Sequence, residues 1–317
     1  MRVFLTSPWI PAEWVRAHGL GSQGIWFAEE FLQATPPLSA GTCAFAENVV
    51  QFAESKGEAV VVFTTACDQL RRGFDEAALR GSSRSFLFNL PATHTPAAKC
   101  IYRAELERLG RFLLQWGGTA PTPKILSQEL AAANQTRRFL REAAPSADAR
   151  SFAEAMSRFY QDGGFSPPSP SKSSADAPLA IVGGPLSMAD WTLFEALKAL
   201  GGFVALNATD NGERSLCPAF DSSSDPFAAL LDGYFEIMSD VFLRPNTRLY
   251  AWLKPRLSSR RVRGIILCCF TGCDLWRAEM QTLREIFQLP VLLLEPDDAG
   301  LSPRDANRLQ AFVETLR

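Results

Sequence analysis

Cysteine is the residue type with the clearest potential for chemistry in this 317-residue chain, which contains seven of them. Cys43, Cys67 and Cys273 each lie between a predicted strand and a predicted helix, and the last two are each followed by aspartate. Thiols near helix N-termini have lowered pKa values, which favours metal ligation. Three thiolates leave one coordination position open, as in a catalytic zinc site or an iron–sulfur cluster with one non-protein ligand. Spacing does not distinguish these metals, because the sequence has no Cys-x-x-Cys pair.

The remaining thiols and the two histidines have simpler interpretations. Cys269, which shares a segment with Cys273, is the rival third ligand. The other cysteines are expected to be packing or surface residues: Cys268 in a buried strand, Cys100 as a small buried hydrophobe at the start of a helix, and Cys217 in a polar loop. His18 and His94 lack a partner motif, so we expect packing or surface roles rather than a catalytic dyad or zinc site.

Composition and charge exclude several classes of protein. Hydrophobic residues make up 47% of the chain and charged residues 21%, which is typical of folded globular domains and excludes disorder. Lys plus Arg (32) against Asp plus Glu (34) leaves a net charge of -2, so no nucleic-acid or anionic-membrane partner is expected. No apolar run approaches the roughly 20 residues that span a bilayer, and residues 1–6 lack a signal-peptide pattern. We therefore expect a cytoplasmic protein without disulfides.

Apolar runs that alternate with helical patterns predict how these residues are positioned. In the first half the predicted strands are residues 1–7, 38–42, 59–65 and 86–90, with a helix at 44–55. The run at 59–65 is typical of a strand buried on both faces of a sheet. From about residue 102 to 160 the pattern is helical alone, which predicts a helical lobe or insertion.

A Ser- and Pro-rich segment at 165–176 predicts a linker between two domains, 1–164 and 177–317. The strands predicted after it are 179–183, 203–206, 264–270 and 289–295, and the helices are 191–200, 276–287 and 305–316. Ser302 is the expected N-cap of the last helix and Pro303 its first residue. This alternation predicts an α/β fold of two doubly wound parallel-sheet domains with a helical insertion.

Two glycine-rich segments have the composition of phosphate-binding loops. Gly19-Leu-Gly-Ser-Gln-Gly24 matches the spacing of a dinucleotide-binding loop, but it follows a predicted helix at 11–18 rather than a strand. It is therefore interpreted as a helix C-cap and turn. Gly183-Gly-Pro-Leu-Ser187 does follow a strand and precede a helix. A tight strand-to-helix turn is the preferred interpretation there, with a phosphate-binding loop as the alternative.

Motifs along nearly the whole chain resemble the 2-hydroxyacyl-CoA dehydratase family, which includes the cluster-bearing subunits of benzoyl-CoA reductase. Cys43-Ala-Phe-Ala-Glu47 and Thr64-Thr-Ala-Cys-Asp-Gln-Leu-Arg-Arg72 are similar to its first two cysteine motifs, and the second is the more specific. The other similar segments are residues 6–20, 181–187, 197–202, 264–274, 292–295 and 308–314. The third cysteine motif departs from the family's Phe-Cys-Asp-Pro, since Gly272-Cys-Asp-Leu275 stands in its place.

The resemblance implies two flavodoxin-like (Rossmann-like) domains and a 4Fe-4S cluster held between them by Cys43, Cys67 and Cys273. It also implies an acyl-CoA thioester substrate, a second homologous subunit and an activator protein that uses ATP to deliver one low-potential electron. The implied reaction forms a ketyl radical on the thioester and eliminates water, which makes the enzyme a lyase. The alternatives are a benzoyl-CoA reductase-like subunit, an iron–sulfur electron-transfer protein without a CoA substrate, and an α/β protein with merely buried thiols.

Overall fold

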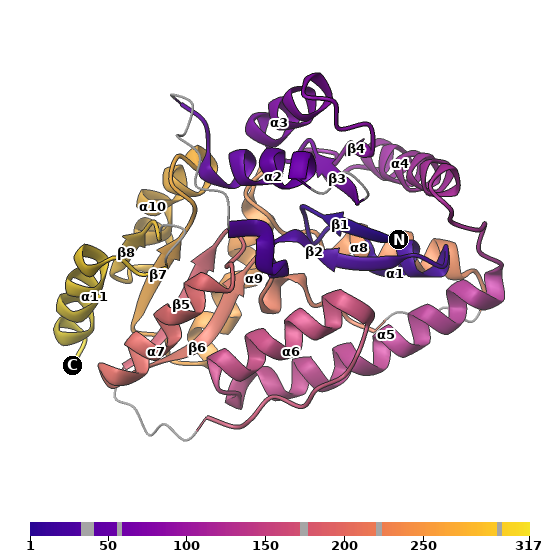
Figure 1. Cartoon of the computed structure of the whole chain (residues 1–317). Coiled ribbons are helices and arrows are strands. Elements are labelled where there is room, and N and C mark those ends of the chain that lie inside the picture. The colour runs from indigo at the N-terminus through magenta and orange to yellow at the C-terminus, as the bar shows by residue number, and fades with distance from the viewer. Residues whose placement is uncertain (33–40, 56–58, 172–176, 220–223, 297–299) are drawn as a thin grey trace.

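The computed structural model describes residues 1–32, 41–55, 59–171, 177–219, 224–296 and 300–317, which form two four-stranded parallel sheets (Figure 1). The first sheet has the order β2-β1-β3-β4 and consists of β1 (Arg2–Leu5), β2 (Gly21–Gly24), β3 (Val60–Thr64) and β4 (Ser85–Phe88). The second has the order β6-β5-β7-β8 and consists of β5 (Ala177–Gly183), β6 (Gly202–Thr209), β7 (Gly264–Cys268) and β8 (Val291–Leu294). The predicted α/β class with two parallel-sheet domains is confirmed.

The strand order reverses in the same way in both sheets, between β1 and β3 in one and between β5 and β7 in the other. In open parallel sheets, ligands bind at such a reversal, outside the carboxyl ends of the strands. The loops that leave β1, β3, β5 and β7 are therefore the places to look for a functional site.

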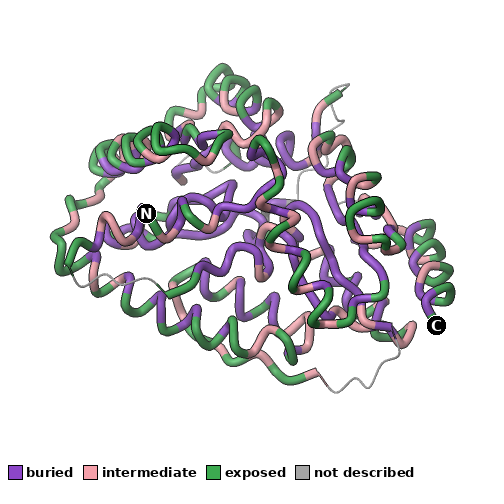
Figure 2. Tube along the Cα trace, turned by 180° about the vertical axis from the view of Figure 1, so that it is seen from behind, coloured by how far each residue is buried: buried purple, intermediate pink, exposed green. Residues whose placement is uncertain are grey.

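Helices cover both faces of each sheet and account for the buried strand residues. The helices of the first half are α1 (Ala12–Ala17), α2 (Ala44–Ser55), α3 (Asp68–Leu79), α4 (Pro96–Gln115), α5 (Pro123–Ala143) and α6 (Ala149–Asp162). Those of the second half are α7 (Thr192–Ala199), α8 (Pro226–Ile237), α9 (Thr247–Ser259), α10 (Asp274–Phe287) and α11 (Pro303–Thr315). Figure 2 shows the strands buried and the outward faces of the helices exposed.

Continuous apolar runs correctly predicted the central strands, because both of their faces are covered. On β3, Val60 and Val62 pack in one core cluster, while Val61 and Phe63 pack in another on the opposite face. Strand β7 divides its side chains in the same way between two clusters. The prediction of the last helix is also confirmed, since the Ser302 hydroxyl accepts a hydrogen bond from the Asp305 N–H at 3.1 Å and α11 begins at Pro303.

Strand β2 is a correction to the interpretation of the first glycine segment. Gly19 does follow α1 with a left-handed φ of 78°, as a helix-ending turn requires, but Gly21–Gly24 pairs in parallel with β1. The sequence did not predict this strand, because Ser22 and Gln23 are polar and give no apolar strand pattern. Ser22 and Gln23 are buried because the first accepts a hydrogen bond from Arg16 and the second donates one to the Phe27 carbonyl.

The helical stretch divides into α4, α5 and α6, whose starts are capped by Thr95, Thr122 and Asp148. Helices α8 and α9 were not predicted. Helix α8 comes from the second half of the chain, yet Leu230 and Phe235 pack in the same core cluster as Val3 and Leu5 of the first sheet. The second half therefore supplies part of the cover of the first sheet (Figure 1).

Two predicted segments fall partly outside the described residues: 38–40 of the short strand and 172–176 of the linker. Residues 165–171 form neither helix nor strand apart from an isolated bridge between Pro170 and Ala147. Within the described ranges, no helix combines the length and apolarity needed to cross a bilayer. The domain limits 1–164 and 177–317 stay a prediction.

Candidate functional site

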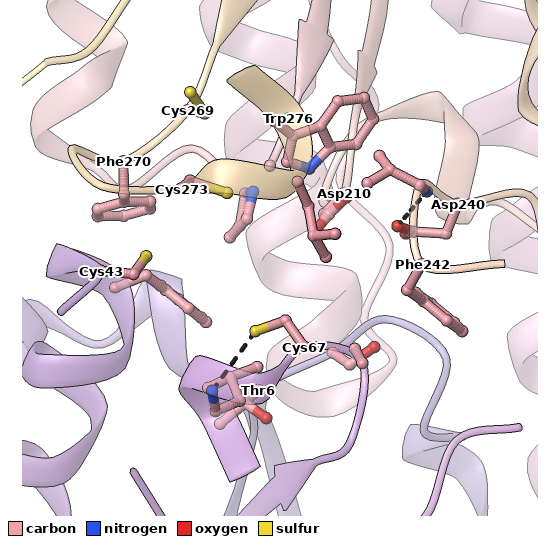
Figure 3. A pocket seen from close by; sticks show the side chains of 18 of the residues that line it. Thr6, Cys43, Cys67, Asp210, Asp240, Phe242, Cys269, Phe270, Cys273 and Trp276 are labelled. Carbon is pink, nitrogen blue, oxygen red and sulfur yellow. Dashed lines mark hydrogen bonds between the residues drawn. The ribbon is translucent and has the colours of Figure 1, made fainter. Parts of the chain in front are cut away.

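A cavity of about 90 Å³ lies where the carboxyl edges of the two sheets meet. Its walls come from the segments that follow β1, β3, β5, β6 and β7, together with the start of α2 and the residues after α8. Four of the seven cysteines line it: Cys43, Cys67, Cys269 and Cys273 (Figure 3). The structure thus brings the three expected ligands and the rival ligand to one place.

Each of the three expected ligands directly precedes the first residue of a helix: Cys43 before α2, Cys67 before α3 and Cys273 before α10. Helix N-termini carry partial positive charge, so three of them at one cavity favour anionic sulfur there. The Cys67 sulfur accepts a hydrogen bond from the Leu70 N–H at 3.4 Å, as an N-cap side chain does. Local sequence therefore positions each thiol, and tertiary packing brings the three helix starts together.

Backbone contacts between the two halves hold Cys43 beside Cys273. The Ala44 N–H donates a 2.9 Å hydrogen bond to the Thr271 carbonyl. Gly272 approaches the same loop so closely that a Cβ at this position would lie 2.9 Å from the Thr42 carbonyl oxygen and 3.3 Å from the Cys43 Cα. With a φ of 79°, Gly272 also has a backbone conformation that other residues rarely adopt. Glycine is required here because two backbones meet.

The thiols of the cavity differ in proton affinity. A hydrogen bond from the Cys273 thiol lowers the pKa of Cys43 to about 7 and raises the pKa of Cys273. Burial raises the pKa of Cys67 to about 11, although the Leu70 N–H opposes this shift. One thiol of the group is therefore close to ionised at neutral pH, and its nearest thiol stabilises that charge.

Cys269 has a different environment from the other three thiols. It lies directly after β7 and is 2% exposed, and its N–H donates to the Leu294 carbonyl at 3.2 Å. Burial raises the pKa of Cys269 to about 12. Figure 3 shows its sulfur pointing away from the space that the Cys43, Cys67 and Cys273 sulfurs surround. Cys273 is therefore the better-oriented partner for Cys43 and Cys67.

The remaining cysteines and the histidines do not line this cavity. Cys268 is buried in β7 as expected, whereas Cys217, expected in a polar loop, is fully buried in the core. The expectation that Cys100 is buried is wrong, because it lies on the exposed face of α4 opposite Tyr102 and Leu106. His18 is buried with Nδ1 2.7 Å from the Trp14 carbonyl oxygen, and His94 stacks on Phe235.

Three thiols with a common orientation fit an iron–sulfur cluster chemically, because such clusters are held by cysteine thiolates. In the part of the chain that the structure describes, no group of three or more His, Cys, Asp or Glu side chains is already at metal-ligand spacing. The three cysteines therefore fit a cluster in the type of side chain and in the direction of their sulfurs, whereas the spacing between them is not that of metal ligands.

Sequence reasoning missed two carboxylates at this cavity and the buried arginine that pairs with both. Asp210 directly follows β6 and Asp240 follows α8, and both line the cavity. Arg214 ion-pairs with both, at 2.7 Å to Asp240. Asp210 could have been found from its position at the end of a buried strand, but no local pattern marks Asp240 or Arg214.

The second glycine segment forms the tight turn that was preferred for it. Gly183 ends β5 with a φ of 150°, and a Cβ there would lie 1.8 Å from the Cys268 carbonyl oxygen. Gly184 and Pro185 continue directly into the cavity wall. The glycine is therefore explained by the close approach of β7.

We expect the Gly272→Ala substitution to weaken the site. The positive φ alone costs on the order of 1–3 kcal/mol, and the added methyl group pushes the Thr42–Cys43 backbone away from Cys273. Gly81→Ala is a matched control, since Gly81 has a φ of 90° with no atom within 4 Å of the added Cβ. Urea unfolding should show a loss in both variants, whereas bound iron after anaerobic reconstitution should fall only for Gly272→Ala. Equal iron in the two variants would contradict this role.

Comparison with known proteins identifies the family of the chain. No curated protein matches the chain. The family described as "2-hydroxyglutaryl-CoA dehydratase, D-component" matches residues 10–316, a range that contains both sheets except for β1 and includes all four cavity cysteines. The chain therefore belongs to the 2-hydroxyglutaryl-CoA dehydratase D-component family.

Proposed function

We propose that this chain is the cluster-bearing component of a 2-hydroxyacyl-CoA dehydratase-like lyase, with Cys43, Cys67 and Cys273 as the ligands of a 4Fe-4S cluster. The observation that carries the proposal is the convergence of three helix-start thiols from two different sheets on one cavity. The family match supplies the reaction class. The preferred substrate class is a 2-hydroxyacyl thioester of coenzyme A.

A cluster with one iron position free of protein ligands supplies a low-potential electron and a Lewis-acid position. The chain's own residues form the cavity around this position. The aromatic and aliphatic side chains of Phe45, Phe242, Phe270, Leu275 and Trp276 line the cavity, and such an apolar lining disfavours bound water. Exclusion of water protects a radical substrate from side reactions and strengthens every electrostatic interaction inside the cavity. The one-electron ketyl route belongs to the same proposal.

The proposal includes a cytoplasmic enzyme with two protein partners, a second homologous subunit and an ATP-dependent activator. Cys43 is buried and Cys273 is part-buried, so these two expected ligands have little contact with bulk solvent. A donor protein docked close to the ligands is the proposed source of the electron. Helices α2 and α3 begin directly after Cys43 and Cys67, so we propose that the donor docks near these two helices.

Anaerobic purification followed by iron, sulfide and EPR analysis tests the proposal. We expect iron and sulfide in a cluster ratio, and dehydration of a 2-hydroxyacyl-CoA once the partner subunit, the activator and ATP are supplied. Absence of iron from anaerobically reconstituted protein would refute the cluster. A reducible cluster without turnover of any acyl-CoA would instead identify an electron carrier, and reduction of an aromatic acyl-CoA would identify a benzoyl-CoA reductase-like subunit.

A further inference from the structure

Asp210 presents one free carboxylate oxygen to the cavity. It follows β6 at the carboxyl edge of the second sheet, and 18% of its side chain is exposed. Its Oδ1 accepts a hydrogen bond from the Arg214 Nη2 group. Among the described residues, no donor is hydrogen-bonded to Oδ2. A carboxylate anchored through one oxygen and open through the other can exchange a proton with a molecule in the cavity.

Arg214 cannot move away from Asp210, because every one of its N–H groups is used. It is 0% exposed in its side chain, and Nε donates to the Ala208 carbonyl at 3.1 Å. Nη1 donates to the Ser239 carbonyl and to Asp240, and Nη2 donates to the Gly183 carbonyl and to Asp210. A guanidinium has five N–H donors, and this one has five partners. Asp210 is therefore held at a fixed place in the cavity wall.

Asp240 lines the same cavity, but both of its carboxylate oxygens are hydrogen-bonded to other groups of the protein. Its Oδ2 accepts hydrogen bonds from the Trp9 indole N–H at 2.8 Å and from Arg214 at 2.7 Å, and its Oδ1 accepts one from the Val241 N–H at 2.7 Å. Both oxygens of Asp240 are therefore hydrogen-bonded within the protein, which leaves Asp210 as the cavity carboxyl with an oxygen available to a bound molecule.

The groups around Asp210 shift its pKa in opposite directions. Burial raises the pKa of Asp210 to about 7, the negative charge of Asp240 contributes to the rise, and Arg214 opposes it. In turn, the negative charge of Asp210 contributes to the raised pKa of the Tyr160 hydroxyl on α6, which is mainly due to burial. General acid–base groups work best with a pKa near the operating pH. The thiols across the cavity are the remaining titratable groups that line it.

We propose that Asp210 is the catalytic residue that exchanges protons with the substrate, an inference that rests on the proposed dehydratase function. The protonated carboxyl donates its proton to the departing 2-hydroxyl, so the C2–O bond breaks and water leaves. The resulting carboxylate then accepts the proton released from C3, which restores the carboxyl. The net change is loss of water from the thioester with no net oxidation or reduction.

The Asp210→Asn substitution tests this role in the assembled enzyme with its partner subunit and activator. Asparagine keeps an acceptor for Arg214 but cannot exchange a proton. We expect unchanged iron content and cluster EPR signal, a similar KM, and a kcat lower by at least about 100-fold, the lower end of general acid–base contributions. Asp210→Glu should restore part of the rate. The matched control is Asp305→Asn on α11, a buried aspartate outside the cavity lining.

A second measurement does not depend on dehydratase activity. Burial raises the pKa of Asp210 in the folded chain above its ordinary value. Between about pH 4 and 7, Asp210 is therefore protonated in the folded chain and ionised in the unfolded chain. The free energy of unfolding of the wild-type chain should therefore fall as pH rises through this interval, relative to Asp210→Asn. Above pH 7 the two curves should run parallel.

The outcomes separate the inference from the proposed function. Wild-type turnover by a cluster-loaded Asp210→Asn enzyme would overturn the role of Asp210 and leave the dehydratase function in place. A cluster-loaded wild type that dehydrates no acyl-CoA would overturn both the dehydratase function and the role of Asp210 in it. In that case the unfolding curves still decide whether Asp210 is a proton-exchanging carboxyl, and identical pH dependence of the two chains would refute that as well.

Discussion

Alanine at Cys43, Cys67 or Cys273 is expected to remove the cluster, as a loss of bound iron and sulfide of at least about tenfold and disappearance of the EPR signal. Loss of a residue that only supports a metal ligand already costs about 10–100-fold in affinity, so loss of a ligand costs at least as much. All three thiols line one cavity at helix starts, and no other described cysteine except Cys269 reaches it. Anaerobic reconstitution of each variant provides the measurement.

Cys269→Ala and Cys100→Ala are the controls for this series. Cys269 lines the cavity, but its sulfur points away from the other three, and Cys100 is exposed on α4 (Figure 3). Both variants should keep the iron of the wild type. Retention of the cluster in Cys273→Ala together with its loss in Cys269→Ala would make Cys269 the third ligand.

The second large effect is expected in the buried ion pair between α1 and α5, to which Tyr234 of the second half is hydrogen-bonded. Glu13 on α1 is 0% exposed and Arg137 on α5 is 1% exposed, and the Arg137 guanidinium donates to the Glu13 carboxylate. The Tyr234 hydroxyl of α8 donates to Glu13 at 2.7 Å and accepts from Arg137 at 3.1 Å. Removing one partner of a buried pair leaves an uncompensated charge, which costs about 3–5 kcal/mol. Arg137→Met should lower the free energy of unfolding by this amount in urea titrations.

Two further variants check the cause of this loss. Because apolar replacement of both partners removes the stranded charge, Glu13→Leu combined with Arg137→Met should recover most of the stability. The exposed pair of Arg71 and Asp68, 3.7 Å apart, provides the surface control. Arg71→Met should change the free energy of unfolding by less than about 1 kcal/mol. A double variant as unstable as Arg137→Met alone would show that lost packing, rather than the unpaired charge, causes the effect.

Prediction of the fold from sequence succeeded where local patterns carry the physical cause. Strands β3 and β7 are apolar runs because both of their faces are buried, and α11 begins where Ser302 can cap it. Strand β2 was missed because hydrogen bonds, rather than apolar side chains, permit burial of Ser22 and Gln23. Helix α8 was not predicted, and its packing against the first sheet depends on contacts distant in sequence.

At the candidate site, too, local sequence predicts some features and tertiary packing decides others. The sequence by itself determined the parallel α/β class and the placement of Cys43, Cys67 and Cys273 directly before helices, because strand and helix patterns are local. Only the tertiary structure decided that Cys43 meets Cys273 across the Ala44–Thr271 hydrogen bond and that the Cys269 sulfur points away. It also decided that Arg214 holds Asp210 and Asp240 at the same cavity. These juxtapositions join segments far apart in the chain, and they form only when the two sheets pack with their carboxyl edges together.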